Sequence, residues 1–316
     1  MEQISFPLAY GCKHKNTDIR LASRSGGVFT AVSDLVLEQD GAVYGCVLNE
    51  KLEAVHIRAE DKVTRDRMRG SKYVQSRMGD TFSRVREDLQ AGKPVLFSGT
   101  PCQVDGLKKF LSVMKTDTAL LLTLDLVCHG VPSPRLWRDY LHYQEKQCGG
   151  AVTAADFRDK RTFGWKARTE TLTVNSNRVS SELYAKLYYT DYALRRSCYE
   201  CAYTSKQRVS DLTLADFWGI DKLDNAFNDN RGVSLILVNT PKGKAYFDSA
   251  ADALEVRQYS IDDVDQRSLN EPFYYNSRRE SFWKDYRENG FDSIIKKYAV
   301  GNPLMPLIEK VASRFI

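Results

Sequence analysis

The sequence predicts an α/β protein, with a mixed, partly parallel sheet flanked by helices, a small β-rich insertion and a helical C-terminal tail. Strand and helix signals alternate through the first half, and one stretch has the strand–helix–strand pattern of parallel neighbours. From about Gly149 the chain changes to short, polar, alternating segments. We therefore divide it into an α/β part over 1–148, a part over 149–265 with the insertion, a Cys-x-x-Cys segment and further α/β structure, and a tail over 266–316.

The first elements follow from periodicity and capping. Apolar residues recur at helical spacing from Val28, and Gly41 supplies the stop, so we expect a helix between them. The stretches "AVYGCVL" and "EAVHIRA" are typical of short strands, and "GDTFSRVREDLQAGK" of an amphipathic helix. Ser133 and Pro134 are a good N-cap and first residue for a later helix.

The middle of this part is a strand–helix–strand unit. A buried strand in "PVLFSGTPC" precedes a helix in "QVDGLKKFLSVM" and a second buried strand in "ALLLTLDLVCHG". Such strands are parallel neighbours joined by a right-handed crossover. Cys102 and Cys128 each follow the carboxyl end of one strand, where open α/β sheets bind ligands. We therefore expect both thiols at one edge of the sheet.

The second half begins with the insertion, which is rich in Thr, Ser and Arg. After it come the stretch "RRSCYECAYTSKQRVSDLTLADFWGI", whose end has the pattern of a strand, and the strand–turn–helix pattern of "GVSLILVNTPKGKAYFDSA". From about Gln266 we expect mainly helix.

Composition narrows the class of protein. The chain has 316 residues and a formal charge of +5, but its basic clusters are too short for a nucleic-acid-binding stripe, so we expect no nucleic-acid partner. Without an apolar run of about 18 residues or a visible secretory signal, we expect a cytoplasmic protein. In that reducing compartment, an odd seven cysteines favour metal or catalytic sites over disulfides.

The Cys198-x-x-Cys201 pair has three interpretations. It is a redox pair, or half of a four-thiolate site completed by Cys102 and Cys128, or a set of unrelated buried cysteines. Four thiolates suit either zinc or an iron–sulfur cluster. The cysteines that fit such a site less well are Cys12, Cys46 and Cys148.

Three loops are compatible with phosphate binding, although each is common when taken alone. "RSGGVFT" precedes a helix, where backbone N–H groups and the helix dipole favour an anion. "RMRGSKYVQS" adds cations and hydroxyls, and "FSGTPC" ends a strand with two hydroxyls. Three such loops on one side of a sheet would form a nucleotide cofactor site. Beside Cys128, His129 is either a proton donor or a structural histidine.

Together these stretches resemble a known family. "SRSGGVFTAV", "RGSKYVQSRMGDTF", "VLFSGTPCQVDGLKKFL", "DLVCHGVPSP", "SCYECAYTSKQRVSDLTLADFWGI" and "GVSLILVNTPKG" are similar, in order, to motifs of the coenzyme F-420 hydrogenase/dehydrogenase beta-subunit family. The resemblance runs from about Ala9 to Gly243.

The resemblance implies an iron–sulfur flavoprotein with FAD and one 4Fe-4S cluster, in which electrons pass between the cluster, the flavin and an organic substrate or a deazaflavin coenzyme. With the edge geometry above, it assigns the cluster thiolates to Cys102, Cys128, Cys198 and Cys201. It places the flavin loops at Ser25, Gly26, Gly27 and Thr30, at Gly70, Ser71, Lys72 and Tyr73, and at Ser98, Gly99 and Thr100. The candidate catalytic residue is His129.

One departure concerns the electron supply. Many relatives carry Cys-x-x-Cys repeats ahead of the Ser-Gly-Gly segment, where this sequence has only Cys12. We therefore expect a separate donor, such as a ferredoxin-like protein, and a small-molecule substrate. Some relatives accompany surface-polysaccharide synthesis. The oligomeric state is open, with a homo-oligomer as one option, and the alternative function is a non-catalytic subunit or module with a structural four-cysteine zinc site.

Overall fold

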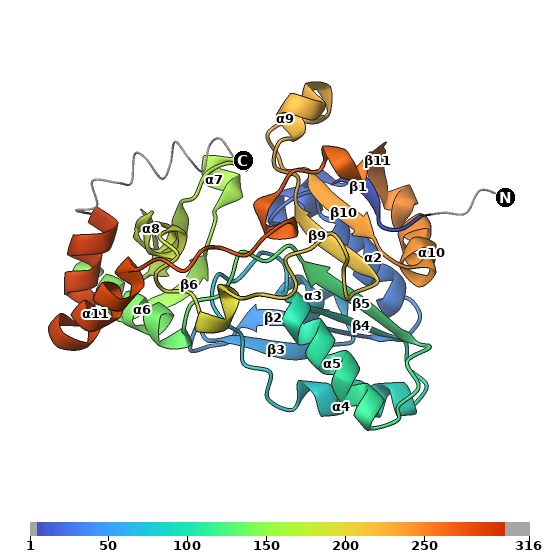
Figure 1. Cartoon of the computed structure of the whole chain (residues 1–316), viewed down its shortest axis with the longest axis horizontal. Helices are drawn as coiled ribbons and strands as arrows, with labels where there is room; N and C mark the ends of the chain where they lie inside the picture. The colour runs from blue at the N-terminus through green and yellow to red at the C-terminus, as the bar shows by residue number, and fades with distance from the viewer. Residues whose placement is uncertain (1–4, 301–316) are drawn as a thin grey trace.

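The computed structural model describes residues 5–300 as two β-sheets with helices packed around them (Figure 1). The larger sheet has eight strands. Across the sheet they are β11 (Leu254–Tyr259), β1 (Leu8–His14), β10 (Ser234–Val238), β9 (Leu212–Asp216), β5 (Leu121–Leu126), β4 (Val95–Gly99), β2 (Ala42–Leu48) and β3 (Ala54–Ala59). The strands β2, β4, β5 and β9 are parallel and the outer pairings are antiparallel, so the predicted mixed sheet is confirmed.

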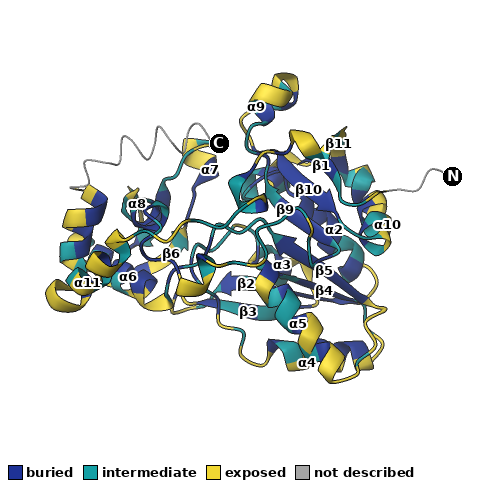
Figure 2. Cartoon of the chain, viewed as in Figure 1, coloured by how far each residue is buried: buried dark blue, intermediate teal, exposed yellow. Residues whose placement is uncertain are grey.

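Helices cover both faces of this sheet. On one face lie α2 (Val28–Leu37) and α10 (Pro241–Ala250), and on the other lie α4 (Thr81–Gln90) and α5 (Pro101–Val113). The strands between them are apolar on both sides: in β10, Ile236 packs in the α2 and α10 core while Leu235 packs in a separate core on the opposite side. Figure 2 shows this buried sheet, with exposed residues on the outer faces of the helices. A continuous apolar strand is typical of a sheet covered on both faces.

The predicted strand–helix–strand unit is confirmed in β4, α5 and β5, whose strands are parallel neighbours. Thr100 and Gln103 form a capping box at the start of α5, and Pro101 lies in its first turn. The chain therefore passes from strand to helix within two residues, which brings Cys102 to the carboxyl edge of the sheet.

The insertion is a separate three-stranded antiparallel sheet. Its strands are β6 (Val152–Asp156), β7 (Glu170–Val174) and β8 (Asn177–Ser181). It packs with α6 (Pro134–Cys148), α8 (Leu183–Tyr189) and α11 (Arg278–Ile294) around an aromatic core that includes Trp137, Tyr140 and Tyr184. The shorter elements of the chain are α1 (Thr17–Ala22), α3 (Lys62–Asp66), α7 (Lys160–Phe163), α9 (Ile220–Leu223), the 3-10 turn η1 (Arg196–Cys198) and further 3-10 turns.

The C-terminal helical stretch is present in α11 and in the π-helix η6 (Ile295–Val300), but it begins later than expected. Residues 271–276 have no regular structure, because Pro272 cannot donate a backbone hydrogen bond and disfavours helix at Glu271. The rest of the expected tail, 301–316, lies outside the described residues. Within residues 5–300, no helix has the length and apolarity needed to cross a bilayer.

Candidate functional site

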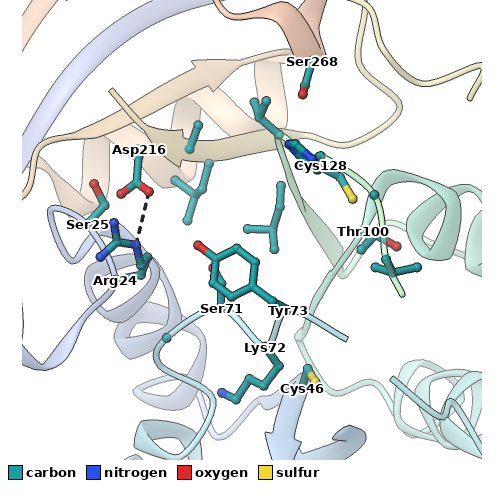
Figure 3. A pocket seen from close by; sticks show the side chains of 18 of the residues that line it. Arg24, Ser25, Cys46, Ser71, Lys72, Tyr73, Thr100, Cys128, Asp216 and Ser268 are labelled. Carbon is teal, nitrogen blue, oxygen red and sulfur yellow. Dashed lines mark hydrogen bonds and ion pairs between the residues drawn. The ribbon is translucent and has the colours of Figure 1, made fainter. Parts of the chain in front are cut away.

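A cavity of about 1050 Å³ opens at the carboxyl edge of the parallel strands, and we call it the central cavity. Its walls include the ends of β4, β5 and β9, the loops around Ser25 and Ser71, the insertion, and the stretch from Gln266 to Phe273. Its volume slightly exceeds the usual range for cofactor and ligand sites, about 300–1,000 Å³. Figure 3 shows side chains from several of these segments, among them Ser25, Thr100 and Asp216, around a common space.

All three predicted cofactor loops contribute to this wall. The predicted residues that line it are Ser25, Gly27, Gly70, Ser71, Lys72, Tyr73, Ser98, Gly99 and Thr100. Gly26 and Thr30 do not line it. Thr30 is fully buried, and its hydroxyl accepts a hydrogen bond of 3.0 Å from Arg69 Nε, so it contacts the second loop.

The Ser-Gly-Gly turn needs its glycines for two different reasons. Gly27 has φ of +93°, a conformation that L side chains rarely adopt. A Cβ on Gly26 would lie 2.7 Å from the backbone nitrogen of Ser234, and closer still to the carbonyl of Cys12. Gly26 therefore allows the loop to pack against β1 and β10, whereas the sequence motif had suggested ligand approach for both glycines.

Three of the four predicted cluster thiols, Cys102, Cys128 and Cys198, line the central cavity. Cys102 is exposed at the start of α5, with its sulfur 3.2 Å from Thr100 Oγ1. Cys198 ends the turn η1, and its Cβ lies 3.4 Å from the position a Cβ on Gly130 would take. Cys201 is half-buried and is not part of the cavity wall.

Backbone pairing brings two of these cysteine segments together. The nitrogen of Arg195 donates to the carbonyl of Val131 at 2.9 Å, and Pro132 forms a β-bridge with Leu194. The chain after β5 therefore pairs with the chain that leads into η1. This contact could not be predicted from spacing, because neither segment is a regular strand.

The four thiols also influence one another electrostatically. Burial raises the pKa of Cys128 to about 12, a hydrogen bond with the Gly130 backbone opposes the rise, and the thiols of Cys198, Cys102 and Cys201 add to it. No group of three or more His, Cys, Asp and Glu within residues 5–300 meets the geometry of a metal site. The assignment of a shared cluster therefore stays a prediction.

The other cysteines lie in different surroundings. Cys12 is fully buried in β1, and burial alone raises the pKa of its thiol. Cys148 packs against the aromatic core of the insertion. Cys46 does line the central cavity, which its position inside a predicted strand did not indicate.

His129 also lines the central cavity and forms a close pair with Asp191. Its Nε2 lies 2.6 Å from the Asp191 carboxylate, and each side chain is 22% exposed. The Phe273 ring lies against the imidazole at a centroid distance of 3.7 Å, and Tyr188 and Tyr189 flank it. The pair is therefore held in a largely aromatic environment. Asp191 was not recognised from the sequence, which gives no local sign that it meets His129.

Sequence reasoning also missed the cationic part of the wall. The insertion contributes Arg158, Lys166 and Arg168 to it. The carboxylate of the "DFWG" stretch, Asp216, ends β9 and also lines the cavity. The Arg168 guanidinium lies 4.4 Å from the Tyr189 ring centroid, within range of a cation–π interaction. The only available signal was the density of Arg and Lys in "RDKRTFGWKAR", which has no periodicity that indicates a direction.

Comparison with known protein families identifies the family of this chain. The family model that describes the C terminus of the coenzyme F420 hydrogenase/dehydrogenase beta subunit matches residues 92–263, more than half of the chain. The chain belongs to this family. The match spans β4, α5, β5, the insertion and the Cys-x-x-Cys segment, so it includes both predicted cysteine pairs. Because family members belong to redox enzyme complexes, the general expectation of an oxidoreductase is supported.

A solved structure shares the fold. It is a xenon derivative of the F420-reducing NiFe hydrogenase complex from Methanosarcina barkeri, matched over 92% of this chain and 91% of that chain, with a TM-score of 0.56 and 16% sequence identity. At that identity the likeness shows the fold alone. No curated protein is significantly similar to the sequence.

Proposed function

We propose that this chain is an FAD- and iron–sulfur-dependent oxidoreductase that passes electrons between a cluster, the flavin and an organic substrate or a deazaflavin-type coenzyme. The observation that carries the proposal is the meeting of three predicted cluster thiols and the three predicted cofactor loops on one cavity. Family membership supports it. The complex with the shared fold, described as F420-reducing, supports a deazaflavin as one candidate substrate.

The donor set fits the proposed groups. Four thiolates are the usual ligands of a 4Fe-4S cluster, and the ligands we propose are Cys102, Cys128, Cys198 and Cys201. For FAD, the fit is a cavity of sufficient size whose lining residues include serine and threonine hydroxyls, glycines and cations. When bound, the cluster supplies single-electron steps and the flavin converts between one- and two-electron transfer.

Within this proposal His129 is the proton donor to the substrate. The Asp191 carboxylate holds Nε2 at 2.6 Å, which fixes the orientation of the ring. No hydrogen bond from residues 5–300 engages Nδ1, so that atom is available to hold a proton for the substrate. Packing of Phe273, Tyr188 and Tyr189 around the ring restricts water at this position.

We infer that electrons enter on the side of Cys102, because this thiol is exposed at the start of α5. The donor would be a separate ferredoxin-like protein in the cytoplasm. Surface-polysaccharide metabolism is one candidate setting for the organic substrate. The rival function is that of a non-catalytic module with a structural four-cysteine zinc site, for which the four thiols are an equally suitable donor set.

The test is the spectrum and metal content of protein purified without oxygen. We expect flavin bands, broad absorbance that bleaches on reduction, and iron and sulfide in equal amounts. Serine at any of the four proposed ligands should lower iron per chain, whereas serine at the control positions should not. The controls are Cys12, Cys46 and Cys148. A colourless protein that contains zinc, or equal iron loss in the controls, would overturn the proposal.

A further inference from the structure

A smaller cavity of about 230 Å³ adjoins the central cavity, and the two share wall residues that include Arg24, Lys72 and Arg158. We call it the side chamber. It lies where the end of α1 with the residues after it (21–24), the loop 69–72 and residues 155–161 of the insertion meet. Six cationic side chains and one carboxylate line it, namely Arg24, Arg69, Lys72, Arg158, Lys160 and Arg161, with Asp156.

Two of these cationic side chains are deeply buried, and one of them has no close carboxylate partner among residues 5–300. Arg158 is 7% exposed and Lys160 is 5% exposed. Lys160 Nζ donates to two carbonyls, Arg20 O at 2.6 Å and Ser25 O at 2.8 Å, and no carboxylate of residues 5–300 lies within 4.0 Å of it. Burial of a charge is unfavourable unless the charge is paired. Cationic side chains therefore outnumber carboxylates in the wall of the side chamber.

One carboxylate lies close to two guanidinium groups beside this chamber. The Asp216 carboxylate lies 3.3 Å from Arg24 Nε and 4.0 Å from Arg158 Nη1, and it also accepts a hydrogen bond from the Trp165 indole at 2.8 Å. The Arg24 side chain is 10% exposed, and its Nη1 is buried with no hydrogen-bond partner among the described residues. Figure 3 shows Arg24 and Asp216 joined at one side of the cavity.

The pKa values of the two lysines are lowered, as expected where burial and neighbouring cations disfavour a further positive charge. Burial, and then the neighbouring Arg24, lower the pKa of Lys160 to about 7. Burial lowers the pKa of Lys72 to about 8, and its ammonium group donates to three backbone carbonyls, with no carboxylate partner among residues 5–300. An anion in the chamber would stabilise both charged lysines.

We propose that the side chamber binds a phosphate or diphosphate group, held by Arg24 and Arg158 and by the ammonium of Lys160. Guanidinium groups match the oxygens of phosphate with two parallel hydrogen bonds, and an ammonium adds a compact charge. The free Nη1 of Arg24 supplies a donor that the described residues leave unused.

The inference rests on the proposed function in naming the source of this group, which is either the diphosphate of FAD or a phosphate of the substrate. Both sources have the same chemistry. In either case the insertion would contribute directly to ligand binding, because Arg158 and Lys160 belong to it.

The experiment measures binding of inorganic pyrophosphate, FAD and riboflavin to the full-length protein by calorimetry, in flavin-free and FAD-loaded forms. The variants are Arg158→Gln and Lys160→Gln. The matched control is Lys146→Gln, which removes one charge from an exposed site on α6. Thermal unfolding of each variant checks that it is folded.

We expect pyrophosphate to bind flavin-free wild-type protein, and each chamber variant to weaken it at least tenfold while Lys146→Gln does not. If the source is the cofactor, the same variants weaken FAD but not riboflavin, and FAD-loaded protein no longer binds pyrophosphate. If the source is the substrate, FAD binding is unchanged and FAD-loaded wild-type protein still binds pyrophosphate.

Wild-type protein gives a decisive result even if a variant does not fold. Absence of pyrophosphate binding at millimolar concentration, with FAD affinity equal in chamber and control variants, would overturn the inference. Pyrophosphate binding by a wild-type protein that takes up no FAD would support the side chamber and refute the proposed cofactor. The two proposals therefore fail in distinguishable ways.

Discussion

Replacement of Arg208 by methionine should destabilise the protein strongly. Arg208 and Asp125 form an ion pair of 3.1 Å whose side chains are 1% and 0% exposed. The guanidinium also donates to the carbonyls of Tyr203 at 2.7 Å and Leu126 at 3.1 Å. It therefore ties the loop after Cys201 to the end of the strand that precedes Cys128.

The magnitude follows from burial. Removal of one partner of a buried ion pair leaves the other charge uncompensated and costs about 3–5 kcal/mol. Burial already raises the pKa of Asp125, and Arg208 is the main group that opposes the rise. Without Arg208, this carboxyl should be protonated in the folded state. Addition of Asp125→Asn should then recover part of the loss, because a neutral amide does not have to take up a proton in order to be buried without Arg208.

Urea unfolding of flavin-free protein measures the change, and iron per chain after reconstitution reports on the loop. Arg208→Met should lower both the free energy of unfolding and the iron content. The control Gln207→Ala, at an exposed neighbour on the same loop, should stay within about 0.5 kcal/mol of wild type. The reasoning is refuted if Arg208→Met matches that control, or if Asp125→Asn adds its full cost to the double variant.

Two further predictions concern β3 and the glycine loop. Burial lowers the pKa of His56 to about 4 from an ordinary 6.5. Below pH 6.5 the unfolded chain therefore takes up a proton more readily than the folded protein, and the free energy of unfolding should fall by about 3 kcal/mol between pH 6.5 and pH 4. Urea unfolding over this range should show a flatter pH dependence for His56→Phe, and parallel curves would contradict this. Gly26→Ala should cost about 1–3 kcal/mol, because its methyl would overlap the backbone at Cys12 and Ser234. In thermal unfolding Gly106→Ala, whose Cβ meets only Phe82 at 3.6 Å, should be neutral or stabilising, and equal midpoints for the two variants would rule out the packing argument.

The parts of the fold that could be predicted are those with a local signal. The strands β4 and β5 are apolar runs bounded by turn residues, and α5 lies between them with its own cap, so their order and direction follow from short-range patterns. The edge position of Cys102 and Cys128 follows from the same patterns. In contrast, β1 in "LAYGCKH" was not predicted, because its Gly and Lys interrupt the pattern. Pairing with β10 and β11, more than 200 residues away, stabilises it.

The site, like the fold, has parts with a local sequence signal and parts that depend on long-range contacts. Loops that carry glycine, hydroxyl and cysteine residues have a recognisable composition, and most of their residues line the central cavity. Arg158 and Lys160 could not be assigned, because their position beside Arg24 depends on how the insertion packs against the first α/β part. The partners of His129 and Arg208 are also distant in sequence, 62 residues away in the case of Asp191. Local patterns predict which elements form, but they do not predict these contacts.

The order of strands places the proposed iron ligands and the proposed phosphate ligands at different strands of the sheet. Cys102 follows β4, Cys128 follows β5, and Asp216 ends β9, which is the next parallel strand. With neighbouring strands about 4.8 Å apart, the strand that carries the first thiol lies about 10 Å from the strand whose carboxylate meets Arg24 and Arg158. A ligand held by its phosphates at the cationic end would have to extend about that far to reach the thiol end. Lys160→Gln should then weaken ligand binding and leave iron unchanged, whereas Cys102→Ser should lower iron without abolishing pyrophosphate binding. If both variants lose iron and pyrophosphate together, the two ends do not act as separate sites.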